Sequence, residues 1–127
     1  MKSREQIYEF MNTYMLGVIS TISQEGLPSA AVVGFGQTKD LQVLIGTKAS
    51  SRKYQNLKSN PHVAFTIGGK TAETIQIEGV AHELPPDEID VVKENYWQKN
   101  PHAEVYSYDS SYTLLCVSLV VGFENLR

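Results

Sequence analysis

Residues 18–45 read VISTISQEGLPSAAVVGFGQTKDLQVLI, and three apolar runs in this stretch are separated by short polar turns. The runs predict β-strands at Val18–Ile22, Ala30–Gly36 and Leu41–Ile45. The turns are too short to hold a crossover helix, so we expect the three strands to form an antiparallel meander. A doubly wound α/β sheet would need a helix between successive strands, and the pattern therefore favours a mainly β fold.

The flanking segments extend this pattern in both directions. Ser3 to Gln6 fits a capping box, and apolar residues at helical spacing predict a helix that ends near Gly17. After the third strand we expect a short helix from Arg52, stopped by Asn60–Pro61. The remaining expected elements are strands at Val63–Ile67 and Thr74–Leu84, a helix that Pro85–Glu88 opens and Asn100–Pro101 closes, and a last strand at Tyr112–Phe123 that is central or buried on both faces.

The whole chain is therefore expected to be one domain, residues 1–127, built as a six-stranded antiparallel split β-barrel with peripheral helices. The formal net charge is −3, so no overall positive field draws the protein to nucleic acid or anionic lipid. The first residues are polar and no apolar run is long enough for a membrane span. Cys116, the single cysteine, is expected to be buried, and we predict a soluble cytoplasmic protein.

The stretch Gly46–Tyr54, GTKASSRKY, opens a helix whose cap is Ser50 or Ser51. A helix begins at the positive end of its dipole, yet Arg52 and Lys53 stand in the first turn of this one. A phosphate group complements the arrangement, because free backbone N–H groups, hydroxyls and two cations converge there. The alternative is a surface helix whose two cations extend into water, where the dipole costs only about 0.3–1 kcal/mol.

Several motifs in register resemble the pyridoxamine 5′-phosphate oxidase-like, FMN-binding split-barrel family. They are LGVIST at residues 16–21, EGLP at 25–28, TKASSRK at 47–53, NPHVA at 60–64 and TIQIEGVA at 74–81. The resemblance implies a homodimer that binds FMN at the subunit interface. It also implies the cofactor-binding residues, which are Gly46, Thr47, Ser51, Arg52 and Lys53 for the phosphate and ribityl chain, Ala31, Val32, Val33 and Gly34 along the flavin ring, and either Thr74 or Gln76 from the second subunit.

The chain also departs from the true oxidase of vitamin B6 metabolism. That enzyme carries an arginine where this chain has Ala31, a lysine where it has Gly36, and a C-terminal arginine-and-histidine motif that is absent here. These groups hold the substrate phosphate, so we expect a short, general member of the family. Gly34 and Gly36 are interpreted as small residues that let a flat ring approach the backbone.

Other candidate residues have simpler interpretations. His62, His82 and His102 share no metal-ligand spacing, so no metal site is expected. Tyr96 and Trp97 are expected to pack in the core or a dimer contact, although an aromatic residue of the helix or of residues 102–111 could stack on a flavin.

The sequence therefore favours an FMN-dependent oxidoreductase that transfers electrons or hydride between a reduced donor and a small-molecule acceptor. Its catalytic residues are unassigned, because flavin chemistry resides in the cofactor. The alternatives are a non-catalytic module that binds, stores or senses flavin or haem, and a dimeric barrel without a ligand. A deazaflavin in place of FMN also stays open.

Overall fold

The computed structural model describes residues 2–101, 112–119 and 124–125. Within them lie the helices α1 (Arg4–Asn12), α2 (Arg52–Ser59) and α3 (Pro86–Lys99). The strands are β1 (Leu16–Ile22), β2 (Pro28–Gly34), β3 (Gly36–Gln37), β4 (Val43–Lys48), β5 (His62–Gly68), β6 (Thr74–Glu83), β7 (Tyr112–Leu119) and β8 (Glu124–Asn125). His102, Tyr106 and Tyr108 lie outside the described residues, as do residues 120–123 of the expected last strand. No described helix combines the length and the apolar character that a membrane crossing requires.

The prediction that the first helix ends near Gly17 is wrong. The capping box at Ser3 and Gln6 is present, but α1 ends at Asn12 and the Thr13 hydroxyl donates to the carbonyl of Phe10. Gly17 instead lies within β1, where an added Cβ would stand 2.5 Å from the Phe65 ring. This glycine therefore lets an aromatic side chain of β5 approach the strand.

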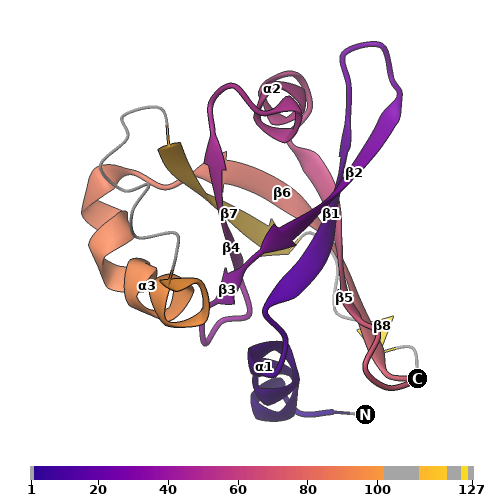
Figure 1. The fold of residues 1–127 in the computed structure, drawn as a ribbon, viewed down its shortest axis with the longest axis vertical. Coiled ribbons are helices and arrows are strands. Elements are labelled where there is room, and N and C mark those ends of the chain that lie inside the picture. Colours follow the sequence, from indigo (N-terminus) through magenta and orange to yellow (C-terminus); the bar gives the residue numbers. More distant parts are fainter. Residues whose placement is uncertain (1, 102–111, 120–123, 126–127) are drawn as a thin grey trace.

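The strands form a curled antiparallel sheet with the order β2-β1-β5-β6-β7-β4-β3, and β8 pairs with β6 (Figure 1). The mainly β, split-barrel fold class is confirmed, although the described residues form eight strands rather than six because the two-residue strands β3 and β8 were not predicted. β1 and β2 form the expected hairpin. The meander is wrong at its third strand, since β4 pairs with β3 and β7 instead of β2.

The third strand is also shifted along the chain. β4 begins at Val43, two residues after the predicted start at Leu41. Leu41 itself has a positive φ of 65° and its backbone N–H donates to the carbonyl of Thr38. A residue in this left-handed conformation belongs to a turn, which delays the strand.

The strand β7 lies between β6 and β4, as predicted for a central strand. Its successive residues Leu114, Leu115, Cys116 and Val117 are all buried, so both faces of the strand are covered. Cys116 is thus the buried free thiol that the sequence predicts. Leu115 and Val117 belong to the main core inside the curled sheet, whereas Leu114 and Cys116 pack in a second cluster with Tyr96 of α3.

The three helices occupy separate places around the sheet (Figure 1). α2 lies beside the β1–β2 hairpin, at the opposite end of the molecule from α1. α3 packs on β3. The start of α2 therefore lies next to the hairpin, and Arg52 and Lys53 share a cavity with residues of β1 and β2.

Candidate functional site

The first turn of α2 has a serine cap, as the sequence predicts, and of the two candidates Ser50 and Ser51 the cap is Ser51. The Ser51 hydroxyl accepts from the backbone N–H of Tyr54 at 3.2 Å. Thr47, which is 4% exposed, lies at the end of β4 with its hydroxyl oxygen 2.7 Å from that of Ser51. The cap is thus connected to the sheet, and this connection fixes where the helix begins.

The two cations of this turn have no anionic partner among the described residues. Arg52 is exposed and Lys53 half-buried, and neither forms an ion pair with a described residue. Their backbone N–H groups also have no acceptor in the described part of the chain. Burial lowers the pKa of Lys53 below its ordinary value, because an amine loses hydration as it enters the protein. An anion bound here would stabilise the charged form of Lys53.

A cavity of about 320 Å³ lies between this turn and the hairpin. Arg52 and Lys53 form one wall, and the other lining residues are Ile19 and Thr21 of β1 with Ser29, Ala30 and Ala31 of β2. None of the described residues that line it carries a carboxylate, so an anion meets no like charge on this part of the wall. The structure thus brings together Ala31, Arg52 and Lys53, three of the residues that the family resemblance implies for the cofactor.

The other implied residues of β2 point in different directions. Val33 is buried in the core, whereas Val32 is 67% exposed on the outer face of the sheet. β2 is an edge strand that pairs only with β1 among the described strands, so one of its backbone edges faces no neighbouring strand. Along that edge the backbone of β2 has no ladder with another strand in the described part of the chain.

The interpretation of Gly34 and Gly36 is corrected by the structure. A Cβ on Gly34 would lie 2.0 Å from the Asn100 side-chain oxygen, and a Cβ on Gly36 would lie 2.9 Å from the Tyr96 Cα. The close approach that requires these glycines is therefore that of α3 and the residue after it. Gly46 is likewise engaged by α3, since its backbone N–H donates to the Tyr96 hydroxyl at 3.1 Å.

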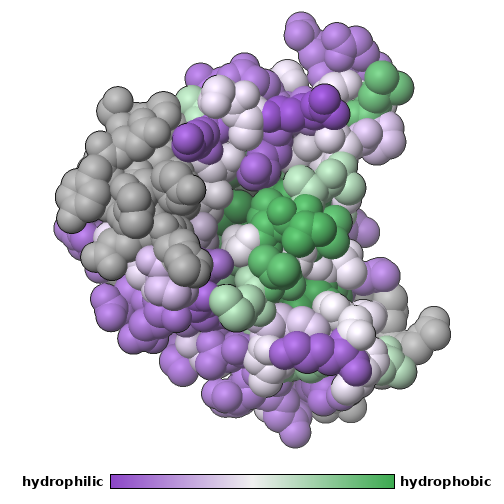
Figure 2. All heavy atoms as spheres, in the orientation of Figure 1, coloured by the Kyte–Doolittle hydropathy of each residue, from purple (hydrophilic) through white to green (hydrophobic). Residues whose placement is uncertain are grey.

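Thr74 and Gln76 lie on β6, away from the cavity of their own chain. They belong to the outer face of the sheet. On this face one row of paired residues crosses the strands β2, β1, β5 and β6, and its members are Val32, Val18, Thr66 and Gln76. Directly paired residues point to the same face, and all four of these are exposed. Figure 2 shows apolar side chains gathered over the crossing of β1 and β2.

The sequence reasoning did not identify Thr21, Ser29, Ile19 or Ala30 as cavity residues. The alternation of strand residues could have placed Thr21 inward, because Ile19 and Thr21 are buried while Val18 and Ile22 are exposed. It could not have shown that α2 closes the cavity, since that depends on where the chain crosses after β4.

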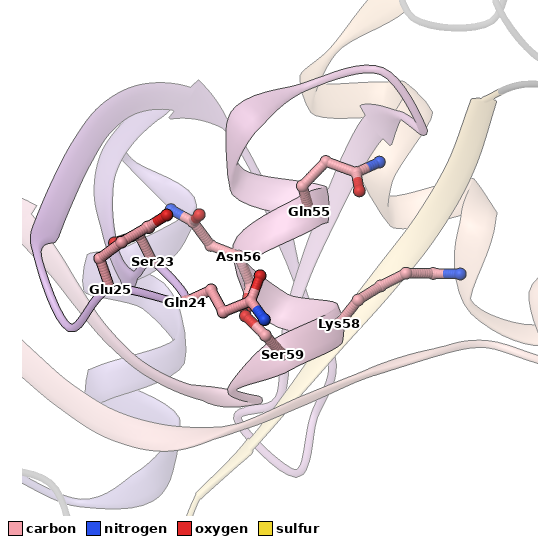
Figure 3. A pocket seen from close by; sticks show the side chains of 7 residues that line it. All are labelled: Ser23, Gln24, Glu25, Gln55, Asn56, Lys58 and Ser59. Atoms are coloured by element: carbon pink, nitrogen blue, oxygen red, sulfur yellow. The ribbon is translucent and has the colours of Figure 1, made fainter.

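A second, polar cavity of about 420 Å³ lies on another side of α2 (Figure 3). Its lining comes from the hairpin turn and the later part of the helix, and includes Ser23, Gln24, Glu25 and Asn56. Figure 3 shows the Asn56 side chain directed toward Ser23, whereas the side chains of Gln55 and Lys58 extend away from the turn. No residue predicted for the cofactor lines this cavity.

Comparison with known proteins agrees with this architecture. The pyridoxine/pyridoxamine 5′-phosphate oxidase of Bacteroides thetaiotaomicron is 29% identical over 86 residues, which are 67% of this chain and 38% of that enzyme. The matched region is thus well under half of the length of that relative. Among solved structures, the haem-binding protein from Mycobacterium smegmatis has a TM-score of 0.83 at 16% identity, over 98% of this chain and 58% of that one.

HutZ, the haem storage protein from Vibrio cholerae, also has a TM-score of 0.83, at 17% identity over 98% of this chain and 95% of HutZ. At these identities the two structures show a shared fold. The family model described as pyridoxamine 5′-phosphate oxidase matches residues 3–120, nearly the whole chain. The protein therefore belongs to the pyridoxamine 5′-phosphate oxidase family.

Proposed function

We propose that the protein binds FMN, with the flavin phosphate in the cavity at the start of α2. The observation that carries this proposal is the cavity wall formed by Arg52 and Lys53, two cations without an ionic partner among the described residues. Arg52 can hold two phosphate oxygens, and Lys53 adds a second positive charge. The free N–H groups at the helix start complete a donor set that fits a phosphate.

The flavin ring would lie along the open edge of β2, at Ala31–Gly34. The backbone groups of an edge strand can donate to and accept from the polar rim of a flat ring. Bound there, FMN would supply hydride or electron transfer, while this chain binds the phosphate, orients the ring and excludes water. The reaction class that we propose is oxidoreduction between a reduced donor and a small acceptor, and we place it in the cytoplasm.

The proposed assembly is a homodimer that covers the outer row of Val32, Val18, Thr66 and Gln76. Val32 and Val18 are 67% and 37% exposed, and Leu16 beside them is 57% exposed. A surface of this kind is stabilised when a second copy removes it from water. Thr74 or Gln76 of the second copy would then contribute a polar group near the flavin.

Haem binding without catalysis is the second candidate. It is favoured by two structures of the same fold whose names state haem binding and haem storage. The exposed apolar residues over β1 and β2 could cover a porphyrin as well as a second subunit. This chain has Ala31 and Gly36 where the true oxidase carries the arginine and the lysine that hold its substrate. The loss of these two cations is compatible with a protein that only stores its ligand.

Titration of the purified protein with FMN and with haemin, followed by flavin fluorescence and Soret absorbance, separates the two candidates. We expect micromolar or tighter FMN binding, and stopped-flow reduction of the bound flavin by NADH or NADPH. Saturable haemin binding with no FMN binding would replace the flavin proposal. FMN binding without reduction or turnover would leave a flavin store.

A further inference from the structure

Thr21 is the most deeply buried polar side chain of the cavity that Arg52 and Lys53 line. It lies on β1, is 2% exposed, and faces inward beside Ile19. A hydroxyl at such a position needs partners for its oxygen and for its hydrogen. How these two needs are met decides what the residue can do.

The oxygen of Thr21 is already satisfied by α2. The side-chain Nδ2 of Asn56 lies 2.9 Å from the Thr21 Oγ1, and both residues are buried. An amide nitrogen can only donate, so Thr21 accepts in this bond. The hydrogen of the Thr21 hydroxyl takes no part in this bond, and no described residue accepts it.

We propose that Thr21 is a further ligand-binding residue, whose hydroxyl donates to the anion held by Arg52 and Lys53. Asn56 is the positioning residue, because its bond to the oxygen leaves the hydrogen free to turn into the cavity. The inference rests on the proposed function in so far as the anion is the phosphate of FMN. It adds a neutral donor from the sheet opposite the cationic wall of the helix.

The charge around the cavity supports this assignment. A hydroxyl that donates to an anion forms a charge-assisted hydrogen bond, which is stronger than one to a neutral acceptor. None of the other described lining residues carries a carboxylate that could compete for the Thr21 hydrogen. An anion in the cavity is therefore the acceptor that the arrangement lacks.

The test compares Thr21→Val, which keeps the shape and removes the hydroxyl, with Thr21→Ser, which keeps the hydroxyl. Each variant and the unmodified protein are titrated with FMN, with riboflavin, which lacks the phosphate, and with inorganic phosphate. We expect Thr21→Val to weaken FMN binding about 10- to 100-fold, the usual worth of a hydrogen bond to a charged group. Riboflavin binding should be unchanged, and Thr21→Ser should bind FMN as the unmodified protein does.

Full FMN affinity in Thr21→Val overturns the inference, and so does an equal loss of FMN and riboflavin affinity. Should Thr21→Val not fold, Thr21→Ala is compared with Thr21→Ser in the same titrations. If the unmodified protein binds phosphate through Thr21 but no FMN, the flavin proposal fails and the role of Thr21 stands. If it binds neither, both proposals fall.

Discussion

Gly34 and Gly36 are separated by Phe35 alone, yet they lie on strands at opposite edges of the sheet. Gly34 ends β2, which pairs with β1, and Gly36 begins β3, which pairs with β4. One residue can join the two edges only because the sheet curls until they meet. Asn100 stabilises this junction from outside, since its Nδ2 donates to the Phe35 carbonyl at 3.0 Å.

This junction predicts a coupling between Gly34 and Asn100. Gly34→Ala should destabilise the protein by about 1–3 kcal/mol, because its Cβ would lie 2.0 Å from the Asn100 side-chain oxygen and its nearest contacts are atoms of that side chain. Asn100→Ala should also destabilise it, through loss of the bond to Phe35. The double variant should be more stable than the sum of the two changes implies, because Asn100→Ala removes the clash. Urea unfolding of the four proteins measures the coupling, and strictly additive losses would contradict it.

Replacement of both Arg52 and Lys53 by alanine should weaken FMN binding by about 2–4 kcal/mol, because it removes two charge-assisted contacts to the phosphate. Fluorescence titration measures the change. The matched control is the double variant Lys39→Ala and Lys58→Ala. It also removes two positive charges, but neither lysine lines the cavity. Equal affinity in both double variants would mean that the phosphate is held elsewhere.

Val32→Lys should dissociate the proposed homodimer. Val32 is 67% exposed at the edge of the outer row, and burial of a charge there on association would cost several kcal/mol. Sedimentation at one protein concentration should show monomer for Val32→Lys and dimer for the unmodified chain. Gln98→Lys, on the exposed side of α3, introduces the same residue as a control and should stay dimeric. A dimer that persists in Val32→Lys would exclude this face from the interface.

Lys99 predicts an unusual dependence of stability on pH. Its Nζ donates to the Met11 carbonyl and to Gln37 Oε1, and burial lowers its pKa from 10.5 to about 7. Between these values the unfolded chain retains a proton that the folded chain has released. The contribution of Lys99 to the free energy of unfolding therefore increases as the pH rises from about 7 to 10.5. Below pH 7 this contribution is constant, because Lys99 is protonated in both the folded and the unfolded chain.

Urea unfolding across this range should show the effect as a difference between the unmodified protein and Lys99→Met, which cannot titrate. Other groups that titrate in both proteins cancel in this difference. A difference in unfolding free energy that does not change between pH 7 and 10 would show that Lys99 keeps its proton in the folded protein.

Much of the fold follows from local pattern. The apolar run Val18–Ile22 predicts β1, and the apolar run Leu114–Val117 predicts a strand covered on both faces. A serine cap at Ser50 or Ser51 also follows from local chemistry, because a hydroxyl before a helix can accept from a backbone N–H of the first turn, and the structure shows that Ser51 fills this role. These features depend on residues that are close in the chain.

The residue at which α1 ends could not be predicted from local pattern. Tyr14 continues the helical spacing of apolar residues, but it is buried after the chain has left the helix, with its hydroxyl accepting from the Lys70 backbone N–H. The roles of Gly17 and Gly36 were similarly ambiguous. A glycine indicates that another group approaches the backbone closely, but it does not identify that group. In this protein the approaching groups are Phe65 and Tyr96.

The sequence by itself determined the longer strands, a serine cap at Ser50 or Ser51 and the cationic first turn of α2, since each depends on spacing and hydrogen bonding between near neighbours. Only the tertiary structure decided that β4 lies beside β7, that α3 accounts for Gly34 and Gly36, and that Thr21 faces Arg52 and Lys53. The physical reason is that these relationships arise when the sheet curls and closes. Curling brings together groups that no local pattern connects.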